Sequence, residues 1–190
     1  QWTQIGGKIA ISNDNSKLIT GGNSGEDVTR IEHPLKLWSL ANPAKPAEVS
    51  SFEGIEGNVI EIAFSNDGRK AFVVVSKNSL MYLHVVDITT KSTTPSQFII
   101  FSIYLGPAPD NILQAFWFSQ NKDFAFYFTA TQFKILRLTD MEQTTVLSLN
   151  SPDRSLHRVF APSLNYQRNA LFIDKTLFIT RLYIDVVPKS

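Results

Sequence analysis

Two stretches of the chain, Ser12-Asn13-Asp14-Asn15-Ser16-Lys17 and Ser65-Asn66-Asp67-Gly68-Arg69-Lys70, are copies of one phrase that begin 53 residues apart. Each copy follows a short apolar segment and precedes another, which is the pattern of a turn between two β-strands. The Asp67-Gly68 pair suits a tight turn that requires positive φ. We expect Asp14 and Asp67 to shape these turns through side-chain to backbone hydrogen bonds rather than to act as catalysts or calcium ligands.

The same pattern recurs in weaker form at 117–128 and at 160–173. A third apolar segment follows each pair, and these segments end at Leu40, Ile88, Leu138 and Leu182, at intervals of 48, 50 and 44 residues. A fourth segment follows in three units, at 47–52, 97–103 and 144–149.

Four strands in a unit of about 45 to 50 residues is typical of a β-propeller blade. The sequence therefore predicts an all-β fold, a β-propeller with about four four-stranded blades. It forms one domain or propeller segment over 1–190, with approximate blades at 1–53, 54–105, 106–150 and 151–190. Two arrangements stay open, a small ring or an arc of a larger propeller. An open arc would expose strand edges that further chain or a partner must cover.

The first two units also resemble known propeller repeats. Leu18–Gly22 with Leu35–Leu40 resembles a WD-repeat blade, although the final pair is Trp38-Ser39 instead of Trp-Asp. Phe64–Val73 with Val85–Thr89 is similar to repeats of the YVTN or LVIVD type. These motifs consist mainly of turn and core residues, so the resemblance implies a fold and no activity.

Composition excludes several classes of function. The net charge is +1, and the basic residues are scattered, so a nucleic-acid partner is not expected. The chain has no cysteine, which excludes disulfides, thiolate metal sites and cysteine nucleophiles. It has no apolar run of about 18 residues, so no membrane-spanning helix is expected.

Catalytic motifs are likewise not found. There is no G-x-S-x-G motif, and His33, His84 and His157 occupy non-equivalent positions in different units, which argues against a shared metal site. The glycine-rich stretch Gly21–Gly25 lacks the Lys-Ser/Thr of a phosphate-binding loop. Phe124, Phe126 and Phe128 alternate onto one strand face, where packing between blades is favoured over stacking on bases or sugars. We therefore expect no enzyme activity, no cofactor and no metal.

One loop interrupts the repeat and is the candidate binding segment. It is a long charged insertion at Gly25–Pro34 in the first unit, and long insertions in repeat folds often carry binding. The candidate binding residues in it are Glu26, Asp27, Arg30, Glu32 and His33.

The resulting hypothesis is a non-enzymatic interaction or scaffold propeller. Its partner would be another protein or the remainder of a larger propeller. The alternatives are a propeller enzyme or a small-ligand or glycan-binding domain with a site at the central axis.

Overall fold

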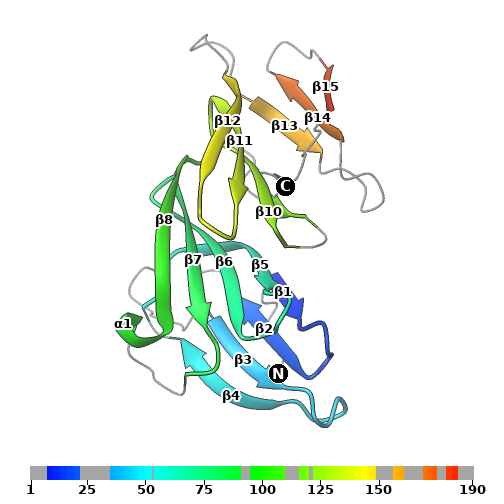
Figure 1. Ribbon diagram of the computed structural model, residues 1–190, viewed down its shortest axis with the longest axis vertical. Coiled ribbons are helices and arrows are strands. Elements are labelled where there is room, and N and C mark those ends of the chain that lie inside the picture. The colour runs from blue at the N-terminus through cyan, green and yellow to red at the C-terminus, as the bar shows by residue number, and fades with distance from the viewer. Residues whose placement is uncertain are drawn as a thin grey trace. The chain divides into compact units, whose positions relative to one another are not determined.

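The computed structural model describes residues 8–21, 35–52, 54–90, 95–109, 116–119, 122–148, 156–160, 169–174 and 179–183. The chain forms two compact units, Gln1–Leu105 and Gly106–Ser190. Both units contain antiparallel sheets in which consecutive strands of the chain pair with each other (Figure 1). We call these sheets blades 1 to 4 in chain order.

The first unit contains blades 1 and 2. The strands of blade 1 are β1 (Lys8–Ile11), β2 (Lys17–Gly21), β3 (Leu35–Ser39) and β4 (Ala47–Phe52). The strands of blade 2 are β5 (Asn58–Phe64), β6 (Lys70–Lys77), β7 (Leu80–Asp87) and β8 (Ile99–Pro107), and the one-turn helix α1 (Pro95–Phe98) precedes β8.

The second unit contains blades 3 and 4. The strands of blade 3 are β9 (Phe116–Phe118), β10 (Phe124–Phe128), β11 (Gln132–Arg137) and β12 (Gln143–Ser148). The strands of blade 4 are β13 (Leu156–Phe160), β14 (Asn169–Asp174) and β15 (Ile179–Tyr183). The predicted turn of the fourth unit falls at 161–168, outside the described residues.

The first turn of blades 1, 2 and 3 has one shared geometry. A serine opens the turn, and its Oγ accepts a hydrogen bond at 3.0 Å from the backbone N–H five residues later. These serines are Ser12, Ser65 and Ser119. The residue three positions after the serine has positive φ, with values of 58° at Asn15, 63° at Gly68 and 54° at Lys122. The third copy, which is weak in sequence, therefore keeps this hydrogen bond and the positive φ at its described residues.

Each of these turns also holds the third strand of its blade. The carbonyl of the next turn residue accepts a hydrogen bond from the backbone N–H of Leu40, Ile88 or Leu138, at 2.8, 3.1 and 2.8 Å. These are the residues that the repeat spacing placed at the ends of the third strands. One six-residue turn thus fixes the relative positions of three strands in each of these three blades.

Blades 1 and 2 pack face to face through an aliphatic and aromatic core. Ile19, Leu35 and Leu37 of blade 1 are buried in one cluster with side chains of blade 2 that include Val59 and Val73. The side chain of Lys8 on β1 pairs with that of Glu61 on β5, with Nζ and Oε2 3.7 Å apart. Side chains of blade 2 pack directly on Gly21, where an added Cβ would lie 2.8 Å from Cγ1 of Val59.

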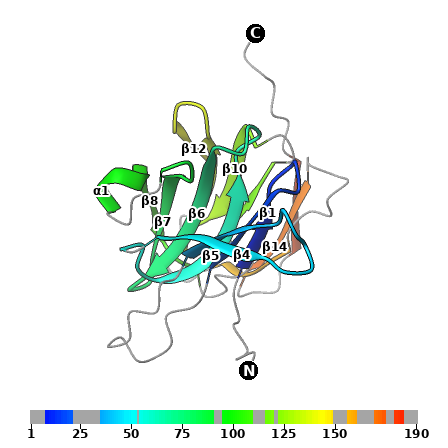
Figure 2. The ribbon, with the colours of Figure 1, turned by 90° about the horizontal axis from the view of Figure 1, so that it is seen from below.

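The fourth strand of blade 2 begins later than the sequence pattern predicts. That pattern places a strand from Gln97, whereas residues 95–98 form α1, which lies beside β8 (Figure 2). Pro95 opens the helix, a position where its missing N–H costs nothing. The helical turn directs Phe98 into the core, and its ring meets Phe52 edge-on with centroids 5.1 Å apart. Burial of this ring is the physical reason for the departure from strand geometry.

Blade 3 has an aromatic core. The rings of Phe126 and Phe128 lie 5.9 and 5.8 Å from that of Trp117, and Phe133 lies 4.6 Å from Phe128. Phe126, Phe128 and Phe133 are buried. Phe126 and Phe128 are buried, as the sequence predicted, and the rings in contact with them belong to blade 3 itself. Packing of this strand face between blades stays a prediction.

Two glycines allow a test of the blade packing. We expect Gly21→Ala to lower the free energy of unfolding by about 1–3 kcal/mol, because the new methyl group overlaps Val59 and Ile62. Gly68→Asn should change it by less than about 0.5 kcal/mol, because nothing lies within 4 Å of its added Cβ and Asn15 holds the same turn position in blade 1. Urea unfolding measures both, and equal losses would contradict this packing.

Candidate functional site

The predicted binding loop lies outside the part of the chain that the structure describes. Glu26, Asp27, Arg30, Glu32 and His33 all fall within residues 22–34. Their role in binding therefore stays a prediction. The candidate site below is built from the described residues.

The two turn aspartates are structural, as predicted. Oδ1 of Asp14 accepts hydrogen bonds from Ser12 Oγ at 2.6 Å and from the backbone N–H of Ser16 at 3.0 Å, and Asp67 has equivalent contacts with Ser65 and Arg69. These bonds, that from the Ser12 side chain first, hold the pKa of Asp14 at about 2. The Ser65 hydroxyl likewise lowers the pKa of Asp67. Both carboxylates are therefore ionised, and their oxygens accept hydrogen bonds from residues of their own turns.

The two copies of the phrase also contact each other across the blades. The ammonium group of Lys17 donates to the carbonyl of Gly68 at 3.1 Å, and the side-chain amide of Asn13 donates to the carbonyl of Asn66 at 3.4 Å. The turns of adjacent blades are therefore joined side by side. Comparison of the two sequences reveals the repeat but not this contact, which depends on how the blades pack.

The candidate binding surface lies on β8, the last strand in the sheet order of blade 2. Three large apolar side chains on this strand are 42–52% exposed, namely Ile100, Phe101 and Tyr104. The strand sequence from Ile99 to Pro107 contains no charged residue. Outer strands are usually protected by charged side chains, proline or a covering segment, so an uncharged strand with exposed rings is a candidate contact surface.

Residues of β7 support one face of this surface. The ring centroids of Tyr82 and Tyr104 are 5.5 Å apart, and Nδ1 of His84 lies 2.8 Å from Oγ of Ser102. Because side chains alternate along a strand, Ile100, Ser102 and Tyr104 share this face and Phe101 is on the other. We call Tyr82, His84, Ile100, Ser102 and Tyr104, together with Phe101, the β8 surface.

Chemically, the β8 surface is mainly aromatic and aliphatic, with one histidine and one serine. Partial burial lowers the pKa of His84, which favours the neutral imidazole. Nδ1 of His84 contacts the hydroxyl group of Ser102. Aromatic side chains with few charges are typical of the centre of a protein interface. The sequence pattern marked this segment only as a strand, because exposure depends on the packing of the blade.

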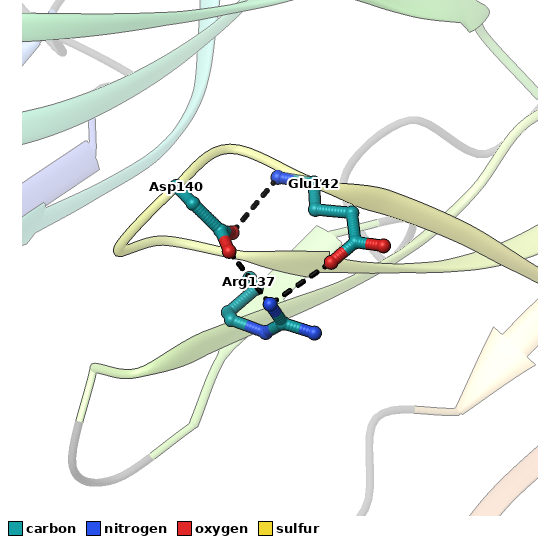
Figure 3. Close-up of polar contacts among 3 residues, drawn as sticks. All are labelled: Arg137, Asp140 and Glu142. Atoms are coloured by element: carbon teal, nitrogen blue, oxygen red, sulfur yellow. Dashed lines mark hydrogen bonds and ion pairs between the residues drawn. The ribbon is translucent and has the colours of Figure 1, made fainter. Parts of the chain in front are cut away.

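A charged cluster in blade 3 closes the hairpin between β11 and β12 (Figure 3). Nη1 of Arg137 lies 2.6 Å from Asp140 Oδ2 and 2.9 Å from Glu142 Oε2. The backbone N–H of Glu142 donates to Asp140, and this bond together with Arg137 lowers the pKa of that carboxyl. The two carboxylates share one guanidinium group, so this exposed cluster links the two ends of the β11–β12 hairpin turn.

The described residues contain no group of three or more His, Cys, Asp or Glu side chains placed to hold a metal ion. Nor do they include a helix of the length and hydropathy that a membrane span requires.

Comparison with known proteins supports the fold. No family model and no curated protein sequence matches the chain. Among solved structures, Kuenenia stuttgartiensis hydrazine synthase matches with a TM-score of 0.54 and 18% identity, over 97% of this chain and 51% of that one. The β-propeller domain of Myceliophteria thermophila Cps50 (Swd1) matches with a TM-score of 0.54 and 10% identity, over 94% of this chain and 52% of that one.

The chain has a β-propeller fold. Three four-stranded antiparallel sheets and the three strands described for blade 4 are the blades, and the predicted fold class is confirmed. The chain spans about half the length of these two solved structures. At such low sequence identity the likeness concerns the fold alone.

The environment of His84 predicts a pH dependence of stability. Its folded pKa lies below the ordinary value of 6.5, so the unfolded chain binds a proton there that the folded chain resists. The stability contributed by neutral His84 is therefore present above pH 6.5 and is lost as the pH falls through the window below it.

We expect His84→Gln, which keeps a group able to hydrogen-bond with Ser102, to reduce this loss. The measurement is the free energy of unfolding in urea at about pH 7.5 and about pH 5.5, where histidine titrates. The other titratable groups contribute to both proteins and cancel in the comparison. Identical pH profiles would show that His84 is not responsible.

Proposed function

We propose that this propeller is a non-enzymatic interaction module and that it binds a protein partner through the β8 surface. The observation that carries the proposal is the exposure of Ile100, Phe101 and Tyr104 on an uncharged outer strand. The proposal agrees with the likeness to a β-propeller domain, a fold that presents strands and loops around a rigid core.

The form of the β8 surface favours an extended segment of the partner. A strand at the end of a sheet can form backbone hydrogen bonds with a strand of the partner. Side chains on the two faces then contact those of the partner and determine which sequences bind. β8 spans nine residues, longer than the six of β4, the corresponding strand of blade 1. The paired rings of Tyr82 and Tyr104 give one face an aromatic anchor, since tyrosine is enriched among the residues that dominate binding energy.

The enzymatic alternative has less support. A catalytic site at the propeller axis needs acidic or histidine side chains that converge from several blades. His84, the histidine whose side-chain contacts are known, lies on β7 beside the outer strand and contacts Ser102. The loop residues Glu26, Asp27, Arg30, Glu32 and His33 remain our prediction for a second, charged contact of the same module.

A peptide selection tests the proposal. The probe is a phage-displayed library of unstructured peptides selected on the folded chain, and the affinity of each recovered peptide is measured by fluorescence anisotropy. We expect apolar peptides whose dissociation constants rise about tenfold to a hundredfold with Tyr104→Ala, because the loss of an anchor ring costs on the order of 1–3 kcal/mol.

Two further variants separate the modes of binding. A peptide paired to the strand edge reads both faces, so Phe101→Ala should weaken it as well, whereas a peptide on the tyrosine face is insensitive to that change. The matched control is Val49→Ala on β4, an exposed aliphatic side chain of blade 1. Recovered peptides that bind Tyr104→Ala as well as wild type, or no recovered peptides, would overturn the proposal.

A further inference from the structure

The β8 surface contains one histidine, and an apolar partner bound there would cover it. Nδ1 of His84 on β7 lies 2.8 Å from Oγ of Ser102 on the neighbouring strand β8 (Figure 1). The next pair along the same two strands is Tyr82 with Tyr104, whose ring centroids are 5.5 Å apart. The imidazole therefore lies between this tyrosine pair and the exposed side chain of Ile100 on one sheet face.

The inner neighbours of His84 are apolar. In the register of β6 and β7, His84 pairs with Val73, which is fully buried. Val73 belongs to the core cluster shared by blades 1 and 2, and Tyr82 packs against this cluster. Blade 1 contributes apolar side chains to it, among them Leu35 and Leu37. His84 thus lies at the margin of a hydrophobic core, and this burial lowers the pKa of its imidazole.

Charged side chains of the sheet lie away from this imidazole. On β6, Lys77 shares the face of His84 but is four positions from Val73, roughly 13 Å along the strand. Lys70 of β6 and Asp87 of β7 pair with each other, and alternation places both on the opposite face. β8 contains no charged residue. Among the described residues, the titratable groups beside His84 on its own face are the phenols of the tyrosine pair.

The carboxylates described in blade 2 contact other partners. Two pair with lysines and two accept hydrogen bonds from residues two positions away, in the order Glu56, Glu61, Asp67 and Asp87. No described carboxylate of this blade is therefore placed to stabilise a proton on His84.

We propose that binding of an apolar segment at the β8 surface is coupled to loss of a proton from His84, so that the module binds at neutral pH and releases its partner in acid. The inference rests on the function proposed above. A segment that covers His84 removes the remaining water from the imidazole, which makes the charged form costlier. Because no described carboxylate of blade 2 offsets this cost, the partner selects the neutral form.

Acid weakens binding because the free protein takes up a proton that the complex excludes. Burial already holds the pKa of His84 below 6.5 in the free protein, and a bound segment lowers it further. Affinity is therefore complete above pH 6.5 and falls as the pH drops through the window below that value.

Peptides from the selection described above test the coupling. The probe is a recovered peptide with capped ends and without Asp, Glu or His, so that its own charge is constant between about pH 7.5 and about pH 5. Fluorescence anisotropy should give a dissociation constant that is about threefold to tenfold higher at the lower pH. His84→Gln, which keeps a group able to hydrogen-bond with Ser102, should reduce this change to less than about twofold.

A second measurement follows the proton on His84 itself. The imidazole resonances of His84 in NMR spectra, assigned by their loss in His84→Gln, give the pKa of this group with and without saturating peptide. We expect a lower pKa in the complex, because the bound segment disfavours the charged form.

The matched control is His157→Gln, which removes a histidine that is not part of the β8 surface and should keep the wild-type pH dependence. Circular dichroism at both pH values establishes that each protein is folded. Peptides that need Tyr104 but bind wild type and His84→Gln with the same pH dependence would overturn the coupling and leave the binding function intact. So would a pKa of His84 that is unchanged or raised in the complex. If no peptide is recovered, or if the recovered peptides do not need Tyr104, the proposed function is overturned and the coupling with it.

Discussion

The fold depends on a six-residue turn whose hydrogen bonds recur in three blades. The opening serine accepts the backbone N–H five residues on, and the carbonyl at the fifth position accepts the N–H at the end of the third strand. Backbone groups that would otherwise be left unpaired at the turn are satisfied within the blade. The register of three strands, and with it the assignment of every side chain to one face or the other, follows from this turn.

Packing between blades 1 and 2 then decides which side chains are buried and which stay exposed. Once Ile19 and Leu37 are committed to the core with blade 2, Ile9 and Ile11 must lie on the opposite face of blade 1. In blade 2 the same logic buries Ile62 and Phe64. The contact proposed at the β8 surface lies on an outer strand whose side chains stay exposed after blades 1 and 2 have packed.

The perturbed titratable groups among the described residues have structural roles. Its most perturbed carboxylate, Asp14, is ionised because it is held by serine hydroxyls in a turn, and its partly buried histidine contacts a serine. The charged cluster around Arg137 closes a hairpin. In each case the pKa shift has a structural cause, which is compatible with a module that recognises a partner through shape and apolar area.

The sequence alone determined the strand plan, because turn chemistry and alternation are local properties. The repeat located the third-strand ends at Leu40, Ile88 and Leu138, and it identified Asp14 and Asp67 as turn residues. The repeat did not predict the helical turn at Phe98. The core that buries the ring of Phe98 includes Phe52 of blade 1, and a pattern within one blade does not indicate that contact. Tertiary structure alone decided that Ile9 is exposed while its repeat partner Ile62 is buried, because exposure depends on which blade lies alongside, and identical local patterns carry no information about their neighbours.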